Sequence, residues 1–141
     1  MKISTLMTAA LLCTGVIATS ASAQTLKKIT DSNKITVSYR EASVPFSYLI
    51  GSTKAVGFSV ELTEAIIDDV RKKTKKPDLQ IAYMPVTSQN RIPLVQNGTV
   101  DIECGSTTNN ATRQKDVAFL PTTFVEEVRI AVKANSGITS I

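Results

Sequence analysis

Strand-like and helix-like segments alternate along this chain, and this alternation constrains the fold more than any other feature of the sequence. Apolar residues alternate with polar ones, or gather in short runs, in four segments that we expect to be strands: residues 35–39, 79–84, 100–104 and 124–134. Segments with helical periodicity separate them. This order predicts an α/β domain in which a mostly parallel sheet is flanked by helices.

The longest helix is expected after Ser59, which has the side chain of an N-cap. Its buried stripe is expected to consist of residues spaced three or four apart, namely Leu62, Ala65, Ile66 and Val70. The segment before it contains Pro45 and Gly51, which are typical of a loop.

Two shorter helices are expected at residues 88–96 and 112–115. Asn97 and Gly98 form a typical stop for the first of them. Pro93 must lie near its first turn, because proline is poorly tolerated in a helix interior.

Residues 1–23 are typical of an export signal. Lys2 precedes an apolar run at residues 6–18, and Ala21-Ser22-Ala23 provides the small residues that signal peptidase requires. A transmembrane anchor is the alternative, but a run of about 13 residues is shorter than the roughly 20 that span a bilayer. Lipoprotein processing at Cys13 is a third possibility, although Leu12 is bulky where a small residue is needed. We expect export and cleavage after Ala23.

Composition excludes several classes of function. The sequence contains no histidine, which removes Ser-His and Cys-His nucleophilic pairs and the common zinc sites. Residues 105–108 lack the glycines and lysine of a phosphate-binding loop, and no dinucleotide fingerprint is present. The net charge is only +4, and the basic run at residues 71–76 lies at a helix end, where cations are favourable. We therefore expect no metal, no cofactor and no nucleic-acid partner.

Polar and cationic residues follow three of the expected strands. Because the carboxyl ends of parallel strands meet at one edge of a sheet, we expect these residues to lie close together. Guanidinium groups bind carboxylates through paired hydrogen bonds, and neighbouring hydroxyls add further donors. Arginine is also common on surface loops, but the set as a whole predicts a site for a carboxylate ligand, formed by Arg40, Ser88, Arg91, Ser106, Thr108 and Arg113.

Four segments of the chain closely resemble one family, the polar amino-acid solute-binding proteins (family 3) of bacterial ABC importers. They are residues 40–48 (REASVPFSY), 56–62 (VGFSVEL), 87–94 (TSQNRIPL) and 103–110 (ECGSTTNN). The runs at residues 88–91 and 103–109 are specific to the branch of this family that binds glutamate and aspartate.

This resemblance implies a type II periplasmic-binding-protein fold, in which two lobes close on a ligand. Residues 24–141 would be the N-terminal lobe, ending near the hinge, and the second lobe is absent from this chain. By the same resemblance, Thr108 and Arg113 would bind the α-carboxylate of the amino acid. Arg40, Ser88 and Arg91 would face its side-chain carboxylate, and Ser106 would add a hydrogen bond.

The resemblance also implies a setting: a monomer in the periplasm that delivers an acidic amino acid to an inner-membrane ABC permease, without acting as an enzyme. Cys104 would be a half-cystine whose partner lies in the second lobe. Without that lobe, this chain is expected to bind its ligand weakly or not at all.

Two other functions remain open from the sequence. One is an exported enzyme on the same fold, similar to a dehydratase of cyclic acids, with Glu41, Glu61 or Glu103 as the proton-transfer group. The other is the sensor lobe of a receptor, which would require a membrane span downstream.

Overall fold

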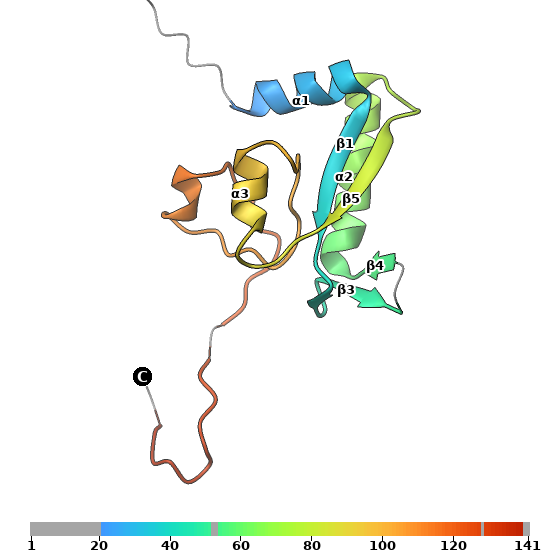
Figure 1. The fold of residues 1–141 in the computed structure, drawn as a ribbon. Helices are drawn as coiled ribbons and strands as arrows, with labels where there is room; N and C mark the ends of the chain where they lie inside the picture. Colours follow the sequence, from blue (N-terminus) through green and yellow to red (C-terminus); the bar gives the residue numbers. More distant parts are fainter. Residues whose placement is uncertain (1–20, 52–53, 128, 140–141) are drawn as a thin grey trace, which may run out of the picture.

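The computed structural model describes residues 21–51, 54–127 and 129–139 (Figure 1). Most of the expected export signal therefore lies outside the described residues, and cleavage after Ala23 stays a prediction. The elements, in chain order, are α1 (Ala21–Ser32), β1 (Lys34–Tyr39), β2 (Ala42–Ser43), β3 (Ser47–Ile50), β4 (Lys54–Val56), α2 (Phe58–Thr74), β5 (Gln80–Pro85), α3 (Arg91–Gln96) and the 3₁₀ helix η1 (Arg113–Lys115).

The main sheet is built around β1. It pairs in parallel with β5, from Lys34 opposite Gln80 to Tyr39 opposite Pro85, which confirms two of the expected strands. On its other side β1 meets the segment at Ile102 through a single parallel bridge to Val37. The expected strand at residues 100–104 is therefore reduced to one bridge, because its backbone hydrogen bonds with β1 are limited to those that Asp101 and Ile102 make with Thr36 and Ser38.

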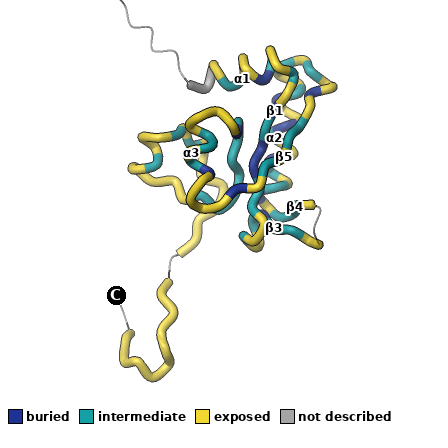
Figure 2. Tube along the Cα trace, viewed as in Figure 1, coloured by how far each residue is buried: buried dark blue, intermediate teal, exposed yellow. Residues whose placement is uncertain are grey.

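Helices α1 and α2 cover the sheet and form the core with it (Figure 1). Figure 2 shows buried residues along β1 and exposed residues along the C-terminal segment. Buried aliphatic side chains from α1, β1 and α2, together with the residue that precedes β5, make up the core cluster, namely Ile29, Ile35, Val37, Ile67, Val70 and Leu79. The architecture is the expected α/β arrangement.

The buried face of α2 differs from the expected stripe. Val70 is buried, as expected, but Ala65 is exposed and Leu62 and Ile66 are only partly buried. The residues of α2 that are buried are Ser59, Thr63, Ile67 and Val70. Leu62 and Ile66 instead line a cavity. Helix α2 therefore has two adjacent apolar stripes, and the stripe expected to be fully buried is the one that faces this cavity.

Ser59 is not the N-cap of α2, contrary to expectation. Gly57 holds that position, and the first N–H groups of the helix donate to backbone carbonyls: Phe58 to Pro45 at 3.1 Å and Ser59 to Phe46 at 2.8 Å. A Cβ on Gly57 would lie 2.6 Å from both of these oxygens, and φ is +121°. The preceding turn caps α2, so no side-chain cap is needed.

The segment expected to be a loop around Pro45 and Gly51 contains a small antiparallel sheet, with β3 between β2 and β4. Here Pro and Gly mark the turns between very short strands, and the expectation of a loop was wrong. Helix α1 was not expected either.

The two shorter helices are confirmed with adjusted bounds. Helix α3 begins at Arg91 rather than at residue 88, which places Pro93 in its first turn. Gly98 follows its C-cap at a φ of +73°. The second is the 3₁₀ helix η1.

The expected strand at residues 124–134 is absent. The described residues from 117 to 139 contain no helix or strand, and in Figure 1 they lead away from the sheet. A strand needs a neighbour for its backbone hydrogen bonds, and none of the described strands pairs with this segment. Its apolar side chains are consequently exposed, Val125 to 86%.

None of the described helices is both long enough and apolar enough to span a bilayer.

Candidate functional site

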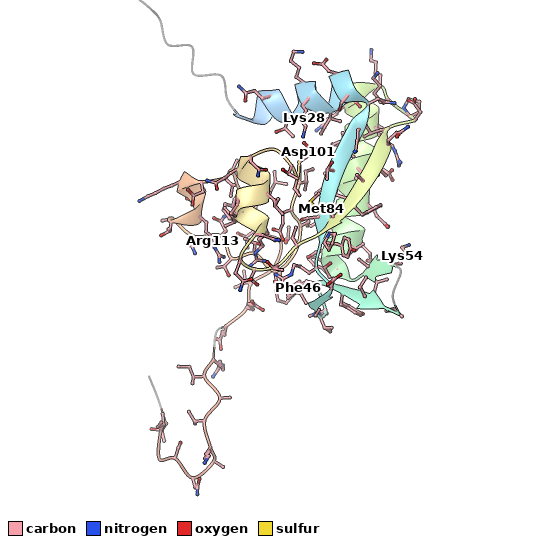
Figure 3. The ribbon with its side chains drawn as sticks, viewed as in Figure 1. Lys28, Phe46, Lys54, Met84, Asp101 and Arg113 are labelled. Atoms are coloured by element: carbon pink, nitrogen blue, oxygen red, sulfur yellow. The ribbon has the colours of Figure 1, made fainter. Side chains whose placement is uncertain are left out.

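The candidate site lies where β1, β5 and the Ile102 segment end. Arg40 directly follows β1, and its Nη1 donates a hydrogen bond of 3.1 Å to the Ser88 hydroxyl, which follows β5. The structure therefore brings together two residues that are far apart in sequence. Arg113 lies at this same end of the molecule, as does Phe46 (Figure 3).

Arg91 is the most unusual residue of the site, because its side chain is only 6% exposed and yet two of its three guanidinium nitrogens have no hydrogen-bond partner in the described structure. Its Nε and Nη1 are buried and unpartnered within the part of the chain that the structure describes. Glu103 provides the one nearby carboxylate, with Oε1 3.9 Å from Nη1 of Arg91. Buried N–H groups are nearly always paired, so this guanidinium is suited to an acceptor from a ligand.

The electrostatic environment of Arg91 shows that the expected arginines gather here. Burial is the main cause that lowers the pKa of Arg91, and the Glu103 carboxylate opposes this effect. The positive charges of Arg40 and Arg113 lower this pKa further. Two further guanidinium groups are therefore close enough to act on Arg91.

Thr108 and Arg113 are also brought together. Nη1 of Arg113 donates a hydrogen bond of 2.9 Å to the backbone carbonyl of Thr108. The turn between them is closed by Asn110, whose Oδ1 accepts from the Arg113 backbone N–H at 3.0 Å. This short turn sets the spacing of the pair.

The loop from Glu103 to Thr107 packs tightly beneath the arginines. Oε2 of Glu103 accepts a hydrogen bond of 2.7 Å from the Thr107 hydroxyl. The Ser59 hydroxyl, at the start of α2, donates to the Gly105 carbonyl at 3.2 Å. A Cβ on Gly105 would lie 2.6 Å from Oε1 of Glu103 and 3.3 Å from Cγ of Arg40, so no larger residue fits without a shift.

A cavity of about 850 Å³ adjoins these residues. Arg91, Ser106 and Thr108 contribute to its polar end, whereas Arg40, Ser88 and Arg113 lie outside its lining. Most of its wall is apolar and comes from α1, α2, α3 and the segment after residue 116, including Leu62, Ile66, Ile92, Phe119, Leu120 and Phe124.

Three phenylalanines form one side of this region. The ring of Phe46 meets Phe124 edge to face with centroids 5.0 Å apart, and it meets Phe58 in the same way at 6.4 Å. Neither this cluster nor Glu103 was among the ligand-binding residues expected from the sequence. An acidic residue directly before the hydroxyl-rich loop was the available signal for Glu103.

Cys104 is free among the described residues and partly buried. Burial is the main cause that raises the pKa of its thiol, and the Glu103 carboxylate raises it further. Hydrogen bonding with Thr63 and Ser59 acts in the opposite direction. Its role as a half-cystine stays a prediction.

The described residues contain no cluster of three or more side chains suited to holding a metal ion.

Comparison with known proteins gives matches over most of the chain. The model of the bacterial extracellular solute-binding proteins, family 3, matches residues 35–139. The glutamate/aspartate import solute-binding protein of Escherichia coli K12 is 52% identical over 118 residues, which are 84% of this chain and 39% of that protein. The L-glutamate/L-aspartate-binding protein of Pseudomonas aeruginosa is 47% identical over 137 residues, 96% of this chain and 45% of that protein. The chain thus spans less than half the length of these relatives.

Solved structures share the fold at lower identity. The solute receptor for L-cysteine of Neisseria gonorrhoeae superposes with a TM-score of 0.57 at 23% identity, covering 67% of this chain and 37% of that one. Domain 1 of TmArgBP, in an arginine-bound form, superposes with a TM-score of 0.56 at 20% identity, covering 79% of this chain and 75% of that domain. These matches confirm the expected fold, with the present chain forming part of one lobe.

Proposed function

Because the chain belongs to the bacterial extracellular solute-binding proteins, family 3, we propose that it is part of the solute-binding component of an ABC importer. The complete protein binds L-glutamate or L-aspartate and delivers it to a membrane permease. Support comes from the relatives in Escherichia coli and Pseudomonas aeruginosa, which are named as glutamate/aspartate-binding proteins.

The observation that carries this proposal is the buried guanidinium of Arg91 with unpartnered N–H groups. A neutral amino acid offers one carboxylate, for which one arginine is sufficient. Arg40 and Arg113 both act on Arg91, so this region offers more guanidinium groups than a single ligand carboxylate can engage, and a second ligand carboxylate has donors available. An acidic amino acid supplies it.

The proposed roles are those that the resemblance to the family implies. Thr108 and Arg113, joined by a short turn, bind the α-carboxylate. Arg40, Ser88 and Arg91 bind the side-chain carboxylate, and the hydrogen bond from Arg40 to Ser88 supports this grouping. Ser106 lines the cavity and donates a further hydrogen bond.

The cellular setting is part of the proposal. Residues 1–23 direct export and are removed after Ala23, and the mature protein works as a monomer in the periplasm. Cys104 pairs with a cysteine of the second lobe. The periplasm is supported by the import function for which the relatives are named.

The dehydratase alternative receives no comparable support. An ancestral cyclohexadienyl dehydratase shares the fold at 21% identity, which is a likeness of fold alone. Glu41 and Glu61 are exposed, and Glu103 is engaged with Arg91 and Thr107. We expect stoichiometric binding of acidic amino acids without turnover of cyclic acids; turnover of a cyclic acid would favour the dehydratase.

The test replaces Arg91 with alanine in the protein extended to both lobes. Isothermal titration with glutamate, aspartate and glutamine should show a loss of affinity for both acids that exceeds the loss for glutamine by about 30-fold, because a buried charge pair contributes roughly 2 kcal/mol or more. Arg129→Ala is the matched control, since Arg129 is exposed and is neither a proposed ligand-binding residue nor part of the cavity lining.

Equal losses for glutamate and glutamine would mean that Arg91 serves the α-carboxylate instead. If the unmodified two-lobed protein binds neither acid, the proposed function is wrong.

A further inference from the structure

Arg91 occupies a position that is unfavourable for a lone cation. Its side chain is 94% buried, and Arg40 and Arg113 act on it with like charge. Arginine is long and flexible, so such a side chain would leave for solvent if nothing compensated its charge. A compensating anion is therefore required when the site is empty.

Glu103 is placed to be this anion. Among the described residues its carboxylate is the one within ion-pair distance of the Arg91 guanidinium, and its side chain is only 10% exposed. The Oε1–Nη1 distance of 3.9 Å is too long for a hydrogen bond. The pair therefore compensates charge without using the hydrogen-bond donors of Arg91.

The Glu103 carboxylate is held in place from two sides. Thr107 donates to Oε2 at 2.7 Å, which fixes the orientation of the group. The missing side chain of Gly105 leaves the space that Oε1 occupies, since a Cβ there would be 2.6 Å away. The backbone before Glu103 is anchored to β1 through the bridge between Ile102 and Val37.

We propose that Glu103 is a positioning residue of the acid-binding site, a built-in counter-ion that holds the Arg91 guanidinium inside the lobe and leaves its N–H groups free for the ligand carboxylate. This inference rests on the proposed function. It explains why a site for anions contains a buried carboxylate of its own, and why Oε1 of Glu103 and two nitrogens of Arg91 all lack hydrogen bonds in the described structure.

Simple charge repulsion predicts the opposite effect of Glu103. If this carboxylate only repelled an anionic ligand, its removal would strengthen binding. If it positions Arg91, its removal weakens binding, because the guanidinium is no longer held where the ligand arrives. The two readings differ in sign, so one substitution separates them.

The test variant is Glu103→Gln, which keeps the size of the side chain and an oxygen that accepts from Thr107. Glu64→Gln is the matched control, because it removes the same charge from an exposed position on α2. We expect the affinity for glutamate, measured by titration calorimetry on the two-lobed protein, to fall about tenfold or more in Glu103→Gln and to stay unchanged in Glu64→Gln. Unchanged or tighter binding by Glu103→Gln would overturn the proposal.

A second measurement needs no ligand. The Nε–H signal of Arg91 in ¹⁵N NMR spectra, assigned by its disappearance in Arg91→Lys, reports how well this group is protected from exchange with solvent. In Glu103→Gln we expect its exchange to accelerate by about tenfold or more, since the guanidinium spends more time outside the lobe. Unchanged exchange would show that Glu103 does not hold Arg91.

Thr107→Val keeps the charge of Glu103 and removes only the hydroxyl that orients it. In Thr107→Val we expect a smaller fall in glutamate affinity and a smaller acceleration of Arg91 Nε–H exchange. If Glu103→Gln does not fold, these two measurements on Thr107→Val test whether Glu103 positions Arg91. If the two-lobed protein binds neither glutamate nor aspartate, the proposed function is wrong. The exchange measurement still tests whether Glu103 holds Arg91 in place. Faster exchange with unchanged glutamate affinity would leave the proposed function intact and reject the role of Glu103 in binding.

Discussion

The surroundings of Cys104 change the acidity of its thiol. Its thiol lies partly buried close to Glu103, and its pKa is raised chiefly by burial. The thiolate is the reactive form, so the thiol in the folded chain should be alkylated by iodoacetamide more slowly at pH 7.5 than in the urea-unfolded chain. The measurement uses a chain that lacks residues 1–23, so that Cys104 is the sole cysteine. Equal rates would contradict the raised pKa.

The same shift affects stability with a definite sign. The folded state favours the neutral thiol, so this contribution is fully present below the pKa of the unfolded thiol and is lost as pH rises through the higher pKa of the folded one. We expect the difference in unfolding free energy between wild type and Cys104→Ser to change across this alkaline range, as measured by urea denaturation. A constant difference would show that the thiol does not couple to folding.

At the residue scale, the sequence predicted that the three arginines come close together, but it did not predict their contacts with Glu103. Arg40, Arg91 and Arg113 follow strands or short loops, and topology alone brings such positions together. Glu103 was predicted only as a possible proton-transfer group of an enzyme, because its contacts depend on side-chain packing across the loop at Gly105. Residue type and sequence spacing alone do not predict which side chain Glu103 contacts.

Asp101 connects elements rather than serving the site. Its Oδ1 accepts from Nζ of Lys28 on α1 at 2.7 Å, and its Oδ2 accepts from the Thr36 backbone N–H on β1 at 2.8 Å. Figure 3 shows Lys28 and Asp101 side by side. The Asp101 side chain is only 3% exposed, so these interactions are shielded from water on the aspartate side.

Replacing Asp101 with alanine should lower the unfolding free energy by about 2–3 kcal/mol, because it leaves the Thr36 N–H and Lys28 without their charged acceptor. The matched control is Asp69→Ala, which removes an exposed pair with Lys73 on the surface of α2 and should cost less than about 0.5 kcal/mol. Urea denaturation of the two variants measures the difference. Equal effects would mean that the contact between α1 and β1 does not depend on Asp101.

At the element scale, helices and strands were predicted correctly where the local sequence contains a clear periodic pattern or stop signal. Strands β1 and β5 show clear strand patterns, and α3 contains its own stop signal. The prediction failed for residues 124–134, whose strand-like pattern finds no pairing partner. It also missed the cap of α2, since that cap comes from the backbone of a preceding turn.

The open geometry of the site limits what this chain can bind alone. Hydrogen bonds to charged groups contribute about 1.5–3 kcal/mol each, and water competes with them wherever the ligand stays hydrated. A micromolar complex requires about 8 kcal/mol after the cost of association. Ser88 and Thr108 are exposed in the lobe, so one side of a bound ligand would remain in water.

We therefore expect this chain to bind glutamate with a dissociation constant in the millimolar range or weaker, corresponding to about 4 kcal/mol. The protein extended to both lobes should bind much more tightly, because closure of two lobes excludes water from the ligand. Calorimetry on the two proteins, after circular dichroism has established that each is folded, measures the difference. Micromolar binding by this chain would contradict the expectation.

The central position of β1 also sets the order in which the sheet can form. The first partner strand of β1, β5, begins at Gln80, and the contact of β1 with the Ile102 segment spans 65 residues, as between Thr36 and Asp101. Closing a loop of this length costs entropy before its contacts form, so sheets with such distant pairings fold slowly. The cationic side chains at the end of β1 therefore come together only after both pairings have formed.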